Sequence, residues 1–185
     1  MAAATTLGVV KGPARLILNP TDFTTTLPYG GTQLGLARGC EFRYGTKTHV
    51  ERAEEWGGAP VRSFYCGDGD ARLAAILRSW DVDALNACWP TSSAGASGSP
   101  VVASTVNGSV RAGKALTGAA ILLVPLDSPG VLPSVYIPNA LPRPDEAAAI
   151  MLSRKTEAGI AVWWDAAPDS VGRAYIVGFL ADMTP

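Results

Sequence analysis

Ser97, the single histidine and several aspartates follow one another in an order that could support nucleophilic catalysis. Ser97 lies in the segment Gly-Ala-Ser-Gly-Ser-Pro-Val-Val at residues 95–102, and the single histidine, His49, precedes it. Aspartates lie between the two, so the order is histidine, aspartate, serine. In such a set the histidine takes the proton of the serine hydroxyl while an aspartate orients the imidazole ring.

The serine segment resembles the nucleophile motif of chymotrypsin-like and viral serine proteases, but its surroundings do not fit that fold. Only 47 residues separate His49 from Ser97, too few to complete one six-stranded barrel and most of a second. Helical periodicity occupies that interval, where the proteases need strands. Ser97 also lies in a run of serine, glycine and alanine, where such a match arises easily by chance. We expect no catalytic residue, and a protease using Ser97 and His49 is the alternative to test.

The remaining polar groups predict neither a metal site nor a cofactor site. Asp68 and Asp70 form an Asp-x-Asp pair, but divalent cations need several oxygen ligands and no third carboxylate lies close in the sequence. Entry into a helix and capping of its first turn explain the pair. Glu54 and Glu55 are adjacent, so on a strand they would point to opposite faces and could not act together as acid and base.

The composition favours a protein that buries surface against other subunits. Charged residues are 17 % of the 185 residues and apolar residues 48 %, so charge is below the usual quarter. The net charge of −1 offers no basic surface for binding nucleic-acid phosphates. The three cysteines, Cys40, Cys66 and Cys88, match neither a disulfide framework nor a zinc pattern, and we expect buried apolar groups. The N-terminal residues lack the pattern of a signal peptide, and no apolar stretch is long enough to span a bilayer.

The apolar pattern predicts a mainly β fold with residues 1–185 in a single domain: two packed antiparallel sheets, as a sandwich or barrel, flanked by one helix. The helix is predicted at about residues 70–88, because Leu73, Ile76, Leu77 and Trp80 recur at helical spacing. Residues 91–100 are rich in serine and glycine and are predicted to form a flexible connector. The predicted strands cover residues 14–18, 36–44, 46–54, 61–66, 119–124, 135–137, 160–164 and 174–180. A turn is predicted at 56–60, the apolar pattern restarts at 101–102, and Asn107-Gly108 predicts a hairpin at 106–110.

Residues 19–35 form an unusually long connection between two predicted strands, with neither helical nor strand periodicity. Structureless connections longer than about 12–15 residues are uncommon in compact domains and are usually functional or disordered. Two prolines stiffen this one, and it carries apolar side chains at Phe23, Leu27, Tyr29 and Leu34. We expect residues 19–35 to form a stiff loop that reaches out and contacts another subunit through these four residues. Deleting residues 21–32 should then leave a folded protein that cannot stack.

Four segments carry a resemblance to a known family: Gly-Pro-Ala-Arg-Leu-Ile-Leu-Asn-Pro at 12–20, Leu-Pro-Tyr-Gly-Gly-Thr-Gln-Leu-Gly at 27–35, Glu-Glu-Trp-Gly-Gly at 54–58, and residues 71–90. They are similar to tail tube proteins, and to related neck and tail-terminator ring proteins, of tailed bacteriophages and gene transfer agents. The resemblance implies rings of six copies that stack into a hollow tube. It also implies that the sheets of neighbouring subunits join and that a long hairpin loop, here residues 19–35, reaches the adjacent ring.

The expected function is therefore that of a virion structural protein that forms rings of a phage tail tube or neck conduit for DNA, without catalysis, cofactor or metal. The expected partners are further copies of the chain, other tail, neck or baseplate proteins, and phage DNA that passes through the lumen without sequence-specific binding. No membrane partner is expected. The expected location is the tail or neck of the virion, after assembly in the host cytoplasm. A tail-terminator or baseplate hub-like ring is the alternative within the same class.

Overall fold

The computed structural model describes residues 3–24, 27–68, 70–78, 85, 88, 92–94, 97–98, 100–102, 117–126, 132–143, 150–151 and 159–185. The main sheet contains β1 (Ala3–Leu18), β2 (Thr32–Ala53), β3 (Ala59–Asp68), β4 (Arg72–Leu77), β7 (Ala119–Pro125), β8 (Ser134–Pro142), β9 (Ile150–Met151), β10 (Gly159–Ala166) and β11 (Ile176–Gly178). A second sheet contains β5 (Ser92–Ala94) and β6 (Pro100–Val102), and two short 3-10 helices are η1 (Glu54–Trp56) and η2 (Leu180–Asp182). The predicted mainly β fold is confirmed.

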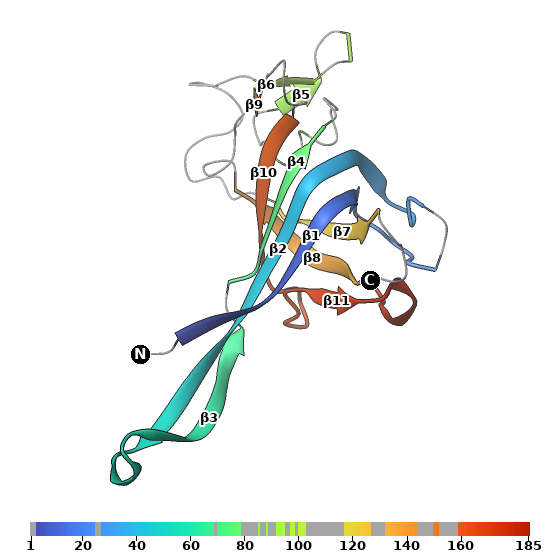
Figure 1. Cartoon of the computed structure of the whole chain (residues 1–185). Coiled ribbons are helices and arrows are strands. Elements are labelled where there is room, and N and C mark those ends of the chain that lie inside the picture. Colours follow the sequence, from blue (N-terminus) through green and yellow to red (C-terminus); the bar gives the residue numbers. More distant parts are fainter. Residues whose placement is uncertain are drawn as a thin grey trace.

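Six strands of the main sheet close into an antiparallel barrel (Figure 1). Their order is β8-β7-β1-β2-β4-β10, and β10 returns to β8 through pairs that run from Trp164↔Pro142 to Ala166↔Ala140. The strands β3, β9 and β11 extend this sheet from β2, β10 and β8. Of the two predicted arrangements, sandwich or barrel, these six strands therefore form the barrel, because β8 and β10, the first and last of the six, pair with each other.

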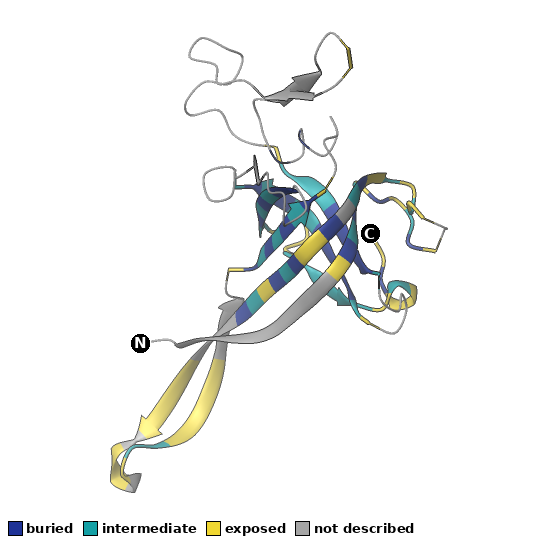
Figure 2. Cartoon of the chain, turned by 45° about the horizontal axis from the view of Figure 1, so that its top comes forward, coloured by how far each residue is buried: buried dark blue, intermediate teal, exposed yellow. Residues whose placement is uncertain are grey.

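Alternate residues of the barrel strands fill its interior, as the period of two along a strand requires. In β4 the buried side chains are Leu73, Ala75 and Leu77, and in β10 they include Val162 and Trp164. Figure 2 shows the same alternation of buried and exposed residues along β2. These side chains belong to one large core cluster, in which Trp164 is 1 % exposed.

The helix predicted at about residues 70–88 is wrong over its first half, where the chain forms strand β4. The spacing of Leu73, Ile76 and Leu77 fits a helical face, but Leu73, Ala75 and Leu77 also alternate. Strand pairing on both edges, with β2 on one side and β10 on the other, decides between the two patterns. In the second half of the predicted helix, Leu85 and Cys88 are described and both are buried; Trp80 lies outside the described residues.

Strand β2 is 22 residues long and leaves the barrel part-way along its length. Its residues 37–43 pair with β4, and its residues 46–53 pair with β3. Residues 46–68 thus form a two-stranded ribbon, called the arm below, which projects beyond the barrel and ends at η1 (Figure 1). The sequence predicted both strands and the turn between them, but not their continuity with the barrel.

The serine- and glycine-rich segment 91–100, predicted as a flexible connector, contains β5 and the first residue of β6. These strands pair antiparallel, from Ser92↔Val102 to Ala94↔Pro100, so the segment forms a small hairpin. The hairpin predicted at residues 106–110 lies outside the described residues.

Candidate subunit interface

The structure does not bring Ser97 and His49 together. His49 lies on the arm, is exposed, and pairs across the ribbon with Phe64. Ser97 is exposed in the turn between β5 and β6, which lies at the opposite end of the molecule (Figure 1). The proton transfer from serine to histidine needs hydrogen-bond contact, so this arrangement leaves the protease alternative without a catalytic pair.

Those acidic residues singled out in the sequence whose side chains are described do not gather into a metal site, and the side chain of Asp68 lies outside the described part of the chain. Within the described ranges, no three His, Cys, Asp or Glu side chains come close enough to hold a metal ion. Glu54 and Glu55 are exposed at the tip of the arm, and Asp70 is exposed just before β4. No helix in the described part of the chain is long and apolar enough to cross a membrane.

Two of the cysteines are free and buried, as predicted. Cys40 lies on β2, and Cys88 belongs to the same core cluster. Burial raises the pKa of the Cys40 thiol to about 11, and burial also raises the pKa of the Cys88 thiol. Both thiols therefore remain protonated at neutral pH and are poor nucleophiles. The side chain of Cys66 lies outside the description.

Two of the four predicted interface residues are already buried in the chain's own fold. Leu34 is 1 % exposed inside the barrel, and Phe23 is 4 % exposed. Tyr29 is partly buried against the same cluster as Phe23, whereas Leu27 is 38 % exposed. A contact of this loop with another subunit stays a prediction, but in this conformation Phe23 and Leu34 have almost no surface to give to it.

Phe23 belongs to a smaller cluster, called the satellite cluster below, on the outside of the barrel. Its buried members come from β1, β7, β8, the loop and the C-terminal segment: Ile17, Phe23, Leu122, Val124, Tyr136 and Met183. The rings of Phe23 and Tyr136 meet edge to face, with centroids 5.0 Å apart and planes at 73°. The loop thus covers one outer face of the barrel.

Hydrogen bonds fix the loop, which spans residues 19–31 because β2 begins at Thr32. The Asn19 amide donates to the carbonyl of Ala120 at 2.8 Å, and the Ala120 amide donates to Asn19 Oδ1 at 3.1 Å. Within the loop, the Thr21 amide donates to the Tyr29 carbonyl at 3.0 Å. Residues 21–32 supply Phe23 and the bond from Thr21 to Tyr29, so their deletion would remove part of the satellite cluster. That such a deletion leaves a folded protein stays a prediction.

The arm exposes several apolar side chains to solvent. Every arm residue of 49–52 and 60–64 is exposed, including Val50 (39 %), Val61 (45 %) and Phe64 (47 %), as Figure 2 shows. Neither core cluster includes a described residue of the arm. An isolated two-stranded ribbon is at best marginally stable in water. Such a ribbon gains stability when another surface covers it.

In the described part of the chain, two strand edges are unpaired, one on the arm and one on β1 beside it. Strand β3 pairs only with β2, so its other edge is open. Strand β1 pairs with β7 only from Ala14 to Leu18, so residues 3–12 pair with β2 alone. Open edges present unpaired backbone N–H and C=O groups, to which another chain can add a strand.

The tip of the arm is held in one conformation by its own backbone. The Gly57 amide donates to the Glu54 carbonyl at 3.1 Å, and Arg52 Nη1 donates to the Gly58 carbonyl at 2.9 Å. Gly57 and Gly58 have φ of 66° and 79°, which glycine adopts without strain. The two glutamates of η1, Glu54 and Glu55, are therefore presented to solvent on a defined turn.

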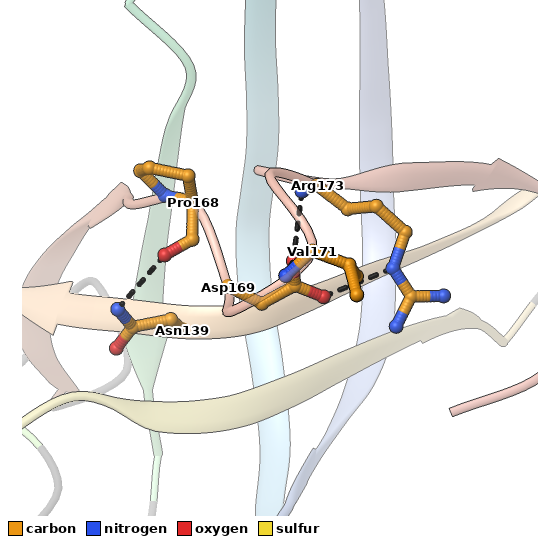
Figure 3. Close-up of polar contacts among 5 residues, drawn as sticks. All are labelled: Asn139, Pro168, Asp169, Val171 and Arg173. Carbon is orange, nitrogen blue, oxygen red and sulfur yellow. Dashed lines mark hydrogen bonds and ion pairs between the residues drawn. The ribbon is translucent and has the colours of Figure 1, made fainter.

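A second ordered turn, residues 167–174, joins β10 to β11 (Figure 3). Asp169 Oδ1 accepts the amides of Val171 and Arg173 at 2.9 and 2.8 Å, and Asp169 Oδ2 accepts Arg173 Nε at 2.9 Å. Desolvation acts to raise the pKa of Asp169, but these hydrogen bonds and the charge of Arg173 outweigh it and lower the pKa. The turn exposes Val171 (72 %), which is not part of the arm and can serve as a control.

Comparison of the chain with protein-family models gives no match, and neither does comparison with curated proteins. The resemblance to phage tail tube proteins, read from four short segments of the sequence, stays a prediction. Function therefore has to be inferred from the surfaces of the molecule, of which the arm and the open strand edges are the most distinctive.

Proposed function

We propose that this protein is a structural subunit that assembles with copies of itself into rings of a phage tail tube or neck, through which DNA passes. The observation that carries the proposal is the arm, a ribbon without a core of its own that exposes Val50, Val61 and Phe64 beyond the barrel. Full burial of an apolar side chain contributes about 1.5–3 kcal/mol. For three side chains that are already partly buried, a contact could add roughly 3 kcal/mol per copy.

The open edges of the ribbon favour a closed assembly. They lie on opposite sides of β2, one on β3 and one on the first part of β1. When the edge of one copy pairs with the other edge of the next, the contact is head-to-tail, and such contacts close into rings if the rotation allows it. Six copies per ring is the number that the family resemblance implies.

The charge of the chain is compatible with a conduit for DNA. A net charge of −1 gives little attraction for phosphates, so DNA could slide through a lumen without being held. The separation of Ser97 from His49 favours an assembly role over the protease.

The direct test is light scattering coupled to size-exclusion chromatography, followed by negative-stain microscopy of the purified protein. Stacked rings would support a tube or neck subunit. Single rings that never stack would favour a tail-terminator or baseplate hub-like ring instead. A monomer at high protein concentration would refute both. A peptidase activity that Ser97→Ala abolishes would favour the protease over the structural subunit.

An arm-shortened variant tests whether the arm is responsible for assembly. Thr48 and Tyr65 are paired across the ribbon, so residues 49–64 can be replaced by Asn-Gly, a dipeptide that closes two-residue hairpins. We expect a folded monomer or small oligomer by circular dichroism and light scattering. Val50→Ser with Phe64→Ser should weaken assembly in the same direction, whereas Val171→Ser should not. Unchanged assembly of the shortened variant would show that the arm is dispensable.

A further inference from the structure

We propose that the outer face of β2, β4 and β10 receives the tip of the arm of a second copy. This inference rests on the proposed assembly and names the surface on which the arm docks. It is drawn from the side chains that strand register places on that face, from the charge of the tip, and from the length of β2.

Strand register builds the face in three rows. The rows are Arg43–Arg72–Asp165, Glu41–Ala74–Trp163 and Arg38–Ile76–Ala161, each running from β2 across β4 to β10. The alternate residues of β4 are buried inside the barrel, so these rows lie on its outer side. Neither core cluster includes a described residue of the rows, whereas the satellite cluster covers the outer side of β1, β7 and β8.

The face has a partly apolar centre and an arginine-rich rim. Trp163 is half-buried beside Ala74, and the Arg72 guanidinium lies 5.6 Å from the centre of its ring. Arg72 Nε and Arg143 Nη1 bind the two oxygens of Asp165 at 3.0 and 2.7 Å. Tryptophan and arginine are the residues most enriched at energetically important interface positions.

The charge of the face is opposite to that of the tip. The face and its rim carry a formal charge of +2. The charged residues are four arginines, Arg38, Arg43, Arg72 and Arg143, and two carboxylates, Glu41 and Asp165. The tip, residues 54–58, carries the two carboxylates of η1, and Arg52, whose Nη1 donates to the Gly58 carbonyl, adds one positive charge beside them. With Glu51, residues 51–58 carry a formal charge of −2. Its turn is preorganised, so little conformational entropy is lost when it docks.

The arm cannot dock on the face of its own chain, because both are parts of one continuous strand. Glu54 at the tip lies thirteen positions after Glu41 on the face. A strand rises about 3.3 Å per residue, so tip and face are up to about 43 Å apart. Figure 1 shows the arm pointing away from β4 and β10. The occupant is therefore a second copy, and the contact is head-to-tail, which propagates a stack.

Charge reversal with rescue tests this contact. E54K/E55K should lower the association constant for stacking by roughly 100-fold or more, because like charges at an interface cost several kcal/mol. D182K, which reverses an exposed carboxylate elsewhere, should stack like the wild type. Adding R38E/R43E to E54K/E55K should restore stacking. Circular dichroism should show that all variants fold, since the changed side chains are exposed.

The outcomes separate this inference from the proposed function. If the wild type stacks and E54K/E55K stacks equally well, the tip is not the contact, while the proposed assembly stands. If E54K/E55K fails to stack and R38E/R43E neither restores stacking nor weakens it alone, the arm docks elsewhere and the inference is wrong. If the wild type forms no assembly, both the proposed function and this inference fail.

Discussion

Replacing Phe23 with alanine tests whether the 19–31 loop serves the fold of its own chain or an interface. Phe23 is 4 % exposed and lies edge to face against Tyr136 in the satellite cluster. Phe→Ala substitutions in cores cost about 3–5 kcal/mol. The satellite cluster is small and lies near the surface, so the loop can partly collapse into the space left behind. We therefore expect Phe23→Ala to lower the free energy of unfolding by about 3 kcal/mol.

Urea denaturation of the unassembled protein, followed by circular dichroism, measures this loss. Slopes of about 1–3 kcal/mol per molar urea convert 3 kcal/mol into a midpoint shift of about 1–3 M. Leu27→Ala is the matched control, because Leu27 lies in the same loop but is 38 % exposed. Its loss should stay near 0.5 kcal/mol, as for surface substitutions in general.

One result would refute the reasoning. If Phe23→Ala unfolds at the same urea concentration as the wild type but no longer assembles, the side chain is an interface anchor. Its burial against Tyr136 would then not contribute to the stability of the fold. A loss of stability with no change in the assembly of the remaining folded protein would support the structural role.

Three further predictions concern Gly31, the two buried thiols and the dependence of stability on pH. Gly31→Ala should destabilise the protein by about 1–3 kcal/mol in urea titrations, because an added Cβ would overlap the backbone carbonyl of Leu18; wild-type stability would show that the loop can shift. In a Cys66→Ser variant, neither Cys40 nor Cys88 should react with a thiol reagent at pH 8 until the protein is denatured, and rapid native labelling would contradict their burial. Because the folded pKa of Cys40 is raised, its contribution to stability is complete below pH 9.0 and is lost as the pH rises towards about 11.

Local sequence predicted most strands but misassigned β4. The segment contains Ala74 and Ala75, one on each face, and alanine marks neither face as apolar. Ile76 lies on the outer face, so counting it with the buried leucines produced a helical spacing. Only the neighbouring strands β2 and β10, whose residues lie far away in the sequence, show that the segment is a strand.

The role of the 19–31 loop could not be read from the sequence either. Its length and apolar residues correctly marked it as unusual. The satellite cluster joins Phe23 to Leu122, Tyr136 and Met183, which lie about a hundred or more positions further along the chain, and nothing local to the loop indicates them. The projecting element is instead the arm, whose two strands and turn were predicted, whereas its projection beyond the barrel was not.

The sequence by itself determined the mainly β composition, the turns, and the shortage of charge that favours assembly. Those properties follow from backbone preferences and from side-chain polarity, which act locally or in sum. Tertiary structure alone decided which apolar residues face inward: Trp163 and Trp164 are adjacent, yet one lies on the outer face and the other fills the core. A strand always has two faces, and only closure of the barrel determines which of them is buried from water.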